Sequence, residues 1–459
     1  MPVDSQQAAS CNAAQEKQAT AIPFAEAFFF WLKLGFISFG GPAGQISVMH
    51  QELVDRRRWI SERRFLHALN YCMLLPGPEA QQLATYIGWL MHRSWGGIVA
   101  GGLFVLPSLV ILTLLSWAYM VYGNTAFVSA MFAGVKPAVV AIVVFAAYRI
   151  GSRVLRNPVL IAIAFAAFLA LFALHVPFPA IIVAAALFGV VGGKAAPSMF
   201  DARPAHGAVS TTHLSAIIDD DTPPPAHAQF RWPRAALILA IGCALWCGGL
   251  AAFVFLQSPS GTLPTMGLFF TKAAFLTFGG AYAVLPYVYQ GAVDQYRWLT
   301  PQQMIDGLAL GETTPGPLIM VVAFVGYIGA WTHVAPQSMS PALAGVLGSL
   351  CATYFTFLPS FMFILLGAPL VEATRDSLGF SAPLTGVTAA VVGVIANLAV
   401  FFAYHVIWPK GFAGGVEWLA VATGVASAIA LFRFKVGIIP LVLGAGAFGV
   451  TMDLWQRWG

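Results

Sequence analysis

The stretch Lys33-Leu-Gly-Phe-Ile-Ser-Phe-Gly-Gly41 returns as Lys272-Ala-Ala-Phe-Leu-Thr-Phe-Gly-Gly280, at an offset of 239 residues (33 to 272). The same offset relates Pro76-Gly77-Pro78 to Pro315-Gly316-Pro317. Because no residue is inserted between the two matches, they indicate an internal duplication.

The duplication extends outward from these motifs. The further matching pairs are Asp55 with Asp294, Arg58-Trp59 with Arg297-Trp298, Tyr86-Ile-Gly88 with Tyr327-Ile-Gly329, and Leu106-Pro-Ser108 with Leu358-Pro-Ser360. The first two pairs keep the offset of 239, and the last two have offsets of 241 (86 to 327) and 252 (106 to 358). The sequence therefore predicts two related halves.

The composition places the chain in a membrane. Of its 459 residues, 59% are hydrophobic and only 9% are charged, and the mean hydropathy is +0.79. Backbone groups in lipid have no water to bond, so each apolar segment must be helical. We expect an all-α polytopic membrane protein with about 13 hydrophobic segments. They begin near Phe24, Arg64, Gly97, Phe127, Val159, Pro179, Arg234, Gly267, Gln302, Leu343, Pro383, Val416 and Gly437.

The segments divide the chain into four parts. A polar tail (1–22) precedes the first half (23–193), and a polar linker (194–233) separates it from the second half (234–459). The linker contains three consecutive aspartates at 219–221 and three prolines at 223–225. Each half has about six segments, and the seventh segment is an extra one that connects them. The halves therefore enter the membrane from opposite sides, as inverted-topology repeats.

The positive residues predict the orientation. With a cytoplasmic N-terminus, most loops rich in Arg and Lys face the cytoplasm, as the positive-inside rule requires. The exception is the first loop, which carries Arg56, Arg57, Arg58, Arg63 and Arg64. This loop also becomes cytoplasmic if the first two segments are re-entrant hairpins that turn back at the Gly-Gly-Pro and Pro-Gly-Pro motifs.

Glycine and proline in the middle of an apolar segment predict broken helices. The motifs are Gly40-Gly41-Pro42, Pro76-Gly77-Pro78, Gly279-Gly280 and Pro315-Gly316-Pro317. Proline removes a helical hydrogen bond, so each break begins a new helix whose unpaired N–H groups carry partial positive charge. Four such ends are suited to hold a small anion near the middle of the membrane. The alternative is that these residues serve kinks and close packing, as in many membrane helices.

Four cations accompany the motifs. Lys33 and Lys272 precede the glycine breaks within apolar surroundings, where an unpaired lysine is costly. We expect them to supply charge to an anion, and snorkelling toward the interface is the alternative. Arg58 and Arg297 lie beside tryptophan, so they are equally well explained as anion-capturing residues or as aromatic-belt anchors.

Three carboxylates are candidate proton carriers. Glu79 directly follows the first Pro-Gly-Pro motif, and Glu312 and Asp306 precede the second. An ionisable group at membrane depth is a functional candidate, although Glu79 is also placed to cap a helix. Gln81 is a candidate donor to an oxyanion.

The heptapeptide Phe36-Ile-Ser-Phe-Gly-Gly-Pro42, followed by Pro76-Gly77-Pro78 and repeated in the second half, resembles the chromate ion transporter family in its long, fused form. The resemblance implies a bacterial inner-membrane protein that exports chromate, confers resistance, and uses the membrane potential or a proton gradient. It also implies a role for Lys33, the Gly40-Gly41-Pro42 turn, Arg58-Trp59 and Pro76-Gly77-Pro78. Ala281 and Leu318 replace Pro42 and Glu79 in the second half. We therefore expect an asymmetric site in which the first half supplies more of the charge.

Other functions fit the sequence less well. Sulfate or another tetrahedral oxyanion is the nearest alternative substrate. A membrane-embedded enzyme is the alternative of another class, but no residues have the spacing of a catalytic centre or a metal site. We therefore expect no enzymatic activity and no cofactor. The net charge of +5 lies in short loops, so the expected partners are an oxyanion and the bilayer, not nucleic acid. A homo-oligomer is compatible with the sequence.

Overall fold

The computed structural model describes residues 22–39, 41–200, 216–220, 222, 225–278, 280–334, 339–373 and 381–458. Within these residues the chain is helical, apart from turns, connecting segments and one isolated β-bridge between Ile60 and Ile218. The predicted all-α fold is therefore confirmed.

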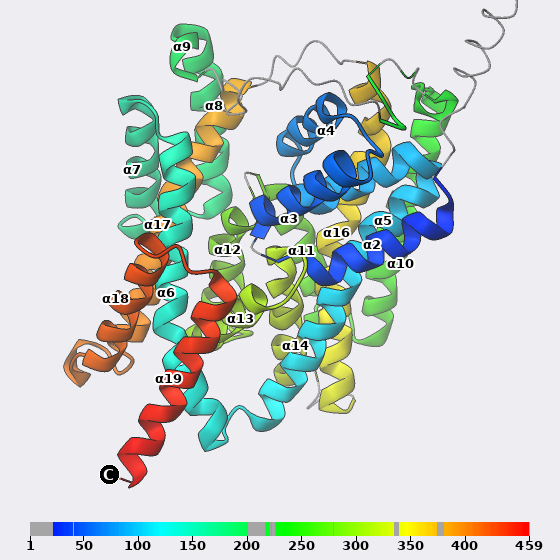
Figure 1. Cartoon of the computed structure of the whole chain (residues 1–459). Helices are drawn as coiled ribbons and strands as arrows, with labels where there is room; N and C mark the ends of the chain where they lie inside the picture. The colour runs from blue at the N-terminus through cyan, green and yellow to red at the C-terminus, as the bar shows by residue number, and fades with distance from the viewer. Residues whose placement is uncertain are drawn as a thin grey trace, which may run out of the picture.

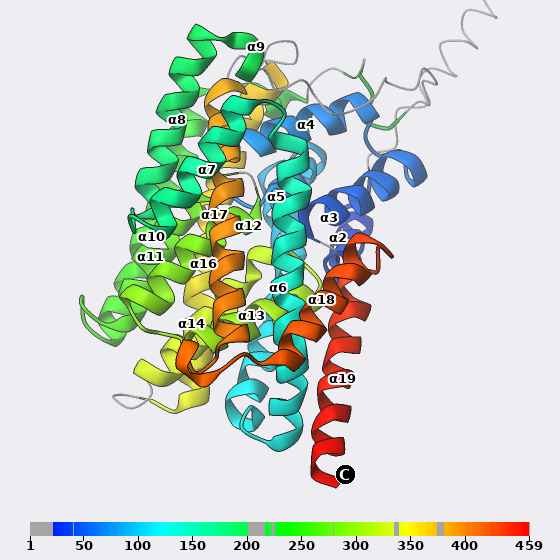
Figure 2. The same ribbon diagram turned by 90° about the vertical axis from the view of Figure 1, so that its left-hand side faces the viewer.

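The described residues of the first half and the linker form ten helical elements. Figures 1 and 2 show how these elements are arranged. They are α2 (Phe24–Ile37), α3 (Gly41–His50), η1 (Gln51–Arg56), α4 (Glu62–Leu74), α5 (Glu79–Tyr122), α6 (Ala126–Val154), α7 (Pro158–Phe172), α8 (Phe178–Ala195), α9 (Pro197–Phe200) and η2 (Ala226–Ala228).

The second half repeats this order after one additional helix. Its elements are α10 (Trp232–Leu256), α11 (Thr262–Leu276), α12 (Ala281–Tyr289), η3 (Gln290–Gln295), α13 (Pro301–Thr313), η4 (Leu318–Met320), α14 (Val321–His333), α16 (Pro341–Ala373), α17 (Ser381–Ile407), η5 (Phe412–Gly414), α18 (Trp418–Phe432) and α19 (Ile438–Trp458).

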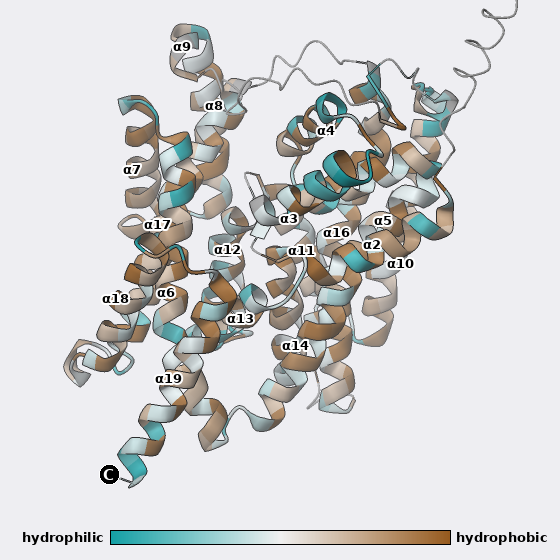
Figure 3. Ribbon diagram, in the orientation of Figure 1, coloured by the Kyte–Doolittle hydropathy of each residue, from teal (hydrophilic) through white to brown (hydrophobic). Residues whose placement is uncertain are grey.

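Seven helices of the described residues are long and apolar enough to cross a membrane: α5, α6, α8, α10, α16, α17 and α19. Shorter apolar helices include α7, η4 with α14, and α18. Figure 3 shows hydrophobic residues along most of these helices, whereas hydrophilic residues gather around α3 and α4. The chain is a multi-pass membrane protein, as predicted.

All four motifs break a helix where the sequence predicts. The first motif separates α2 from α3, and the second separates α4 from α5. In the second half, the corresponding breaks separate α11 from α12 and α13 from η4. The 14 residues of α2 extend roughly 21 Å, which is too short for a hydrocarbon core of roughly 30 Å.

Helix α5 contains a reversal that divides it into two parts. The backbone leaves the helical region at His92 (φ −132°, ψ 31°) and Arg93 (φ 58°, ψ −157°). Beyond this point the chain folds back, because Gly88 and Gly96 are packed too closely to admit a side chain at either position. This reversal separates the predicted segments that begin near Arg64 and Gly97.

The first-half hairpins begin and end on one face of the molecule. In the first hairpin, Arg57 near its end pairs with Glu26 near its start (Nη1 to Oε1, 3.1 Å). In the second, Ser61 before α4 donates to the linker residue Asp220 (2.6 Å). The hairpin returns at Trp89, whose carbonyl accepts a bond from the linker residue His227 (3.1 Å). Both elements therefore re-enter, and the arginine cluster lies on the linker face.

The second-half hairpins start from the opposite face. Helix α10 leaves the linker at Arg234, which donates to the His227 carbonyl (2.6 Å), and its 25 residues extend roughly 37 Å. Helix α11 starts beside the far end of α10, where Leu263 N donates to Gln257 (2.8 Å). Both second-half hairpins return to the same region, because Trp298 contacts Phe269 in α11 and Gly329 at the end of α14. The predicted inverted topology is present.

The repeat is also visible in the backbone angles. Gly41 and Gly280 have φ of 70° and 101°, Gly77 and Gly316 have 134° and 102°, and Arg58 and Arg297 have 52° and 54°. Each arginine follows a π-helical turn, η1 in the first half and η3 in the second. Matched positive φ angles at three pairs of positions confirm the internal duplication.

Candidate functional site

The tips of hairpins from opposite faces meet through two reciprocal hydrogen bonds. Gly77 N donates to the Thr277 carbonyl (2.7 Å), and Gly316 N donates to the Ser38 carbonyl (2.8 Å). The offset of 239 relates Ser38 to Thr277 and Gly77 to Gly316, so each bond is the repeat counterpart of the other. We call the meeting point of residues 38–42, 76–79, 277–281 and 315–318 the crossing.

Two serines pack against the crossing from the long helices. A Cβ atom at Gly77 would overlap the hydroxyl of Ser360, and one at Gly316 would lie 2.8 Å from the Cβ of Ser108. Ser108 and Ser360 are themselves repeat partners in the Leu-Pro-Ser motifs. Each half therefore supplies a serine that closes onto the Pro-Gly-Pro glycine of the other half.

Four helical segments begin at the crossing. Helices α3, α5 and α12 start at Gly41, Glu79 and Ala281, and η4 starts at Leu318 and continues into α14. The first N–H groups of a helix have no partner within that helix. They give the crossing donors and partial positive charge without a fixed cation, which suits an anion.

Several buried polar atoms at the crossing have no hydrogen-bond partner among the described residues. They are Ser38 Oγ, Gln45 Oε1, Gln81 Oε1, Gln82 Oε1 and Ser360 Oγ. The amides of Gln45 and Gln82 are oriented by backbone carbonyls, because their nitrogens donate to Gly316 O and Pro76 O. A buried polar atom without a partner is costly, so these atoms indicate a place for a polar ligand or for water. Of the five, only the hydroxyls of Ser38 and Ser360 can donate to an anion, whereas the three amide oxygens can only accept hydrogen bonds.

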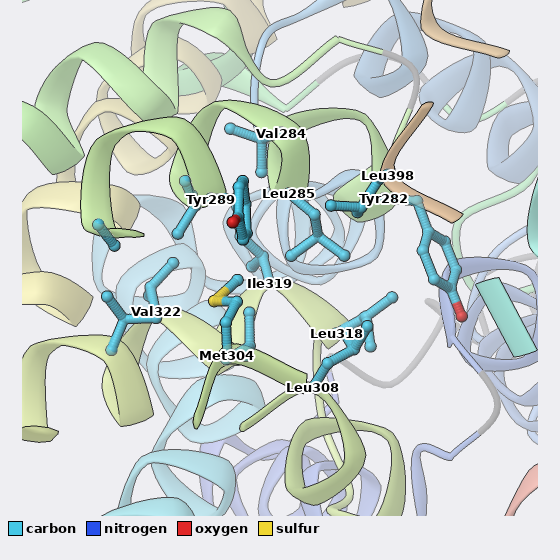
Figure 4. Packing of buried hydrophobic residues seen from close by; sticks show 14 of the residues in the cluster. Tyr282, Val284, Leu285, Tyr289, Met304, Leu308, Leu318, Ile319, Val322 and Leu398 are labelled. Atoms are coloured by element: carbon cyan, nitrogen blue, oxygen red, sulfur yellow. The ribbon is translucent and has the colours of Figure 1, made fainter. Parts of the chain in front are cut away.

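At three positions the second half has apolar side chains where the first half has polar ones. The repeat counterparts of Gln45, Glu79 and Gln82 are Val284, Leu318 and Val321. Figure 4 shows Val284 and Leu318 among Leu285, Leu308 and Ile319 in the packed aliphatic core. Glu79 and the two glutamines therefore have no polar counterpart in the second half, whereas each half supplies one serine.

Only one of the three candidate proton carriers faces a glycine break directly. The Glu79 carboxylate is buried, and its Oε2 lies 3.7 Å from the position of a Cβ on Gly280. Glu312 accepts a hydrogen bond from Tyr282, which follows that break. Asp306 lies six residues before Glu312 in α13, farther from the crossing. It accepts a hydrogen bond from Tyr119 (2.9 Å) and pairs with Lys136 (3.5 Å).

The structure does not bring the four predicted cations to the crossing. Lys33 and Lys272 are exposed, and Lys272 lines an apolar groove of about 490 Å³ together with Trp246 and Phe275. Arg58 and Arg297 are also exposed and occupy the positive-φ turns that follow η1 and η3. Gly40 and Gly279 lie outside the described residues.

Sequence reasoning missed some residues of the crossing. Ser38 and Ser360 lie within the repeated motifs, so the repeat itself contained a signal for them. No comparable signal marks Gln45. Among the described residues, no three His, Cys, Asp or Glu side chains are grouped as metal ligands.

The family model of the chromate transporters matches residues 25–190 and 264–450, so it covers most of both halves. The chain belongs to the chromate transporter family. It is 32% identical to a chromate transport protein of Pseudomonas aeruginosa over 95% of this chain and 94% of that protein. It is 27% identical to a chromate transport protein of Cupriavidus metallidurans, over 92% of this chain and 91% of that protein. A probable chromate transport protein of Synechococcus elongatus is also 27% identical, over 81% of this chain and 82% of its own length. No solved structure is detectably similar to this chain.

Proposed function

We propose that this chromate transporter family member exports chromate across the bacterial inner membrane and thereby confers chromate resistance. The observation that carries the proposal is the crossing, where helix starts from opposite faces meet beside buried polar atoms that lack partners. The membership of the family supplies the substrate class, since the relatives are named for chromate transport. The N-terminus and the linker lie on the cytoplasmic side in this proposal, as the positive residues require.

The crossing would bind the oxyanion with neutral donors. Helix N–H groups beyond Gly40-Gly41-Pro42, Pro76-Gly77-Pro78, Gly279-Gly280 and Pro315-Gly316-Pro317 would surround it. The hydroxyls of Ser38 and Ser360 would complete the shell, together with the second N–H of the Gln81 amide, whose nitrogen also donates to Thr85. Donors of this kind match the four oxygens of a tetrahedral oxyanion.

Three of the exposed cations would act before binding. Lys33, Arg58 and Arg297 lie outside the crossing and would raise the local concentration of anions near the hairpins. This role needs no direct contact with the bound ion. Lys272 lines an apolar groove, so its side chain would instead snorkel toward the interface.

The membrane potential would drive export, because an anion leaving a cell that is negative inside moves down the electrical gradient. Protons would bind a carboxylate of the transporter after chromate has left, and would thereby change the rate at which the empty transporter returns to its cytoplasm-facing state. Glu79 is the first candidate for this duty because its carboxylate faces the Gly280 break. Asp306 and Glu312 are the alternatives, since both are buried and bonded to tyrosine hydroxyls.

The experiment is uptake of labelled chromate into everted membrane vesicles that contain the protein. An interior-positive potential should drive accumulation, and collapsing the potential should abolish it. Vesicles without the protein are the control. Uptake that ignores the potential would reject the proposed energy source.

Sulfate is the second candidate substrate, because the neutral donors of the crossing suit any tetrahedral dianion. Addition of unlabelled sulfate to the same vesicles separates the two. A transporter selective for chromate needs a large excess of sulfate to inhibit uptake, whereas a general oxyanion carrier is inhibited at equal concentrations.

A further inference from the structure

Two buried ionic clusters lie away from the crossing, and each joins the two halves. The first lies near the linker, where Glu372 at the end of α16 accepts a hydrogen bond from Tyr86. The Glu372 carboxylate also lies 3.7 Å from Arg64 Nη2, and both side chains are almost fully buried. His67 in α4 donates to the carbonyl of Val371 (3.1 Å). We call this group the linker-side lock.

The second cluster lies near the opposite face and has the same chemistry. Asp306 in α13 accepts a hydrogen bond from Tyr119 in α5 (2.9 Å) and pairs with Lys136 in α6 (3.5 Å). The Asp306 side chain is 4% exposed and that of Lys136 is 27% exposed. We call this group the far-side lock. In each lock, a carboxylate of the second half is held by a cation and a phenol of the first half.

The internal repeat relates the two locks. His67 and Asp306 are separated by the offset of 239, and Tyr119 and Val371 by the offset of 252. The contact of His67 with Val371 is therefore the repeat counterpart of the contact of Asp306 with Tyr119. The first contact joins α4 of the first half to α16 of the second half, and the second contact joins α13 of the second half to α5 of the first half.

The locks lie at matching distances from the crossing. Tyr119 follows Ser108 by 11 residues, and Val371 follows Ser360 by 11 residues. At 1.5 Å per residue, this places each lock roughly 16 Å along its helix from the serine at the crossing. Helix α4 carries His67 of the linker-side lock and lies toward the linker in both views (Figures 1 and 2). Helix α13 carries Asp306 of the far-side lock and lies farther from the linker.

Each lock lies near one face of the molecule. Arg64 of the linker-side lock donates to the carbonyl of the linker residue Thr222 (2.7 Å). Tyr119 of the far-side lock lies three residues before the end of α5. The part of α5 that carries Tyr119 begins after the reversal, at Ser94, which accepts a hydrogen bond from Arg234 beside the linker. Both locks are formed in this structure.

We propose that these two clusters are opposing gates that open in turn to expose the crossing to one face of the membrane. A separation of the halves at one face breaks one carboxylate from its cation and phenol, while the other lock holds. Removing one partner of a buried ion pair strongly destabilises the closed arrangement. This inference rests on the proposed function in one respect, namely that the crossing is the site where the substrate binds.

The test measures access to the crossing from each face, so it does not depend on transport. A reporter cysteine replaces Ser360 in a chain without Cys11, Cys72, Cys243, Cys247 and Cys351. A membrane-impermeant thiol reagent is then applied to right-side-out and to everted vesicles. Cysteines at the exposed residues Gln229 and Asn124 identify the linker face and the far face. Glu372→Gln and Asp306→Asn are introduced separately into the reporter chain.

We expect Glu372→Gln to raise labelling from the linker face only, and Asp306→Asn to raise it from the far face only. The increase should reach roughly a hundredfold, because loss of one partner of a buried pair shifts the closing equilibrium by that order. Increased labelling from both faces in either variant indicates general loosening and overturns the proposal, as does labelling unchanged from the parent.

A double variant with exchanged charges distinguishes loss of the ion pair from loss of the fold. Lys136→Asp combined with Asp306→Lys restores an ion pair at the far-side lock, and labelling from the far face should return toward the parent level. Persistent labelling in a well-folded double variant would show that the ion pair is not what closes this face.

Discussion

Ser38 and Ser360 have fully buried hydroxyls at the crossing, with no partner for either oxygen among the described residues. If they donate to the bound oxyanion, Ser38→Ala and Ser360→Ala each remove one charge-assisted hydrogen bond, worth about 1.5–3 kcal/mol. We expect the apparent affinity for chromate to fall roughly tenfold to a hundredfold in each variant, measured as KM for vesicle uptake.

Ser116→Ala is the matched control for this measurement. Ser116 is also fully buried in α5, but its hydroxyl already donates to the carbonyl of Leu112 (2.6 Å). Its replacement should leave KM unchanged. Equal effects in all three variants would mean that buried serines serve packing only.

Lys33 calls for a different expectation because its side chain is exposed outside the crossing. Lys33→Gln removes a charge that attracts anions, so we expect KM to rise roughly tenfold at low ionic strength while the maximal rate is kept. The increase should disappear in high salt, since screening removes the attraction in the parent as well. Lys410→Gln, at another exposed lysine, is the control. Loss of the maximal rate would instead place Lys33 in the transport machinery.

The special backbone positions could be predicted from the sequence where the same motif occurs in both halves. Positive φ angles are shared across the halves by the glycine pairs Gly41–Gly280 and Gly77–Gly316 and by the arginine pair Arg58–Arg297. Sequence reasoning missed Gln45, since a polar residue in a single half has no repeated signal. It could not place Lys33 and Lys272 either, because their exposure depends on which face of each helix packs against its neighbours.

At the scale of elements, the Pro-Gly-Pro turn is the most constrained connection. Gly77 has a φ of 134°, and a Cβ there would overlap the Ser360 hydroxyl. We expect Gly77→Ala to lower the free energy of unfolding by about 2–4 kcal/mol, from backbone strain and overpacking together. Thermal unfolding of the detergent-purified protein measures this loss.

The control is Gly102→Ala in α5, the helix that follows this turn. A Cβ at Gly102 meets no atom within 4 Å, and its backbone is helical, so this variant should be unchanged or slightly stabilised. If both variants unfold at the temperature of the parent, the turn tolerates a side chain and the crossing is looser than its geometry indicates.

The broken helices could be predicted because proline and glycine act locally on the helical hydrogen-bond pattern. The reversal at His92 and Arg93 has no such residues at its two non-helical positions. Its position depends on the close packing of Gly88 against Gly96 and on the linker beneath it. Tertiary contacts of this kind are not visible in a local pattern.

At the scale of the whole molecule, the contact between the arginine cluster and the linker fixes their common face. A cysteine at Arg57 in a cysteine-free chain should react with an impermeant reagent in everted vesicles and not in intact cells. A cysteine at Asn124, at the end of α5, should show the opposite pattern. Labelling of both positions from one face would contradict the re-entrant hairpins.

The electrical driving force gives a quantitative prediction for the complete transporter. Moving a charge across 100 mV is worth about 2.3 kcal/mol, so a dianion gains about 4.6 kcal/mol. At about 1.4 kcal/mol per tenfold ratio, this supports more than a thousandfold gradient without protons. Accumulation in everted vesicles should therefore rise tenfold for about every 30 mV of interior-positive potential. The measurement belongs at alkaline pH, where chromate is fully deprotonated.

Protons enter this balance only if the carrier itself exchanges them. Glu79 is buried at the Gly280 break, where its ionised form would place negative charge beside the anion site. We expect Glu79→Gln to keep the dependence on potential but to lose any dependence of the rate on a pH gradient. If Glu79→Gln responds to the pH gradient as the parent does, Glu79 caps α5 and the proton pathway runs through Asp306 or Glu312. A slope of about 20 mV per tenfold ratio in the parent would mean that three net charges cross per cycle, as when a proton returns on the empty carrier, whereas a slope of about 60 mV would mean that a proton accompanies the dianion in the same direction.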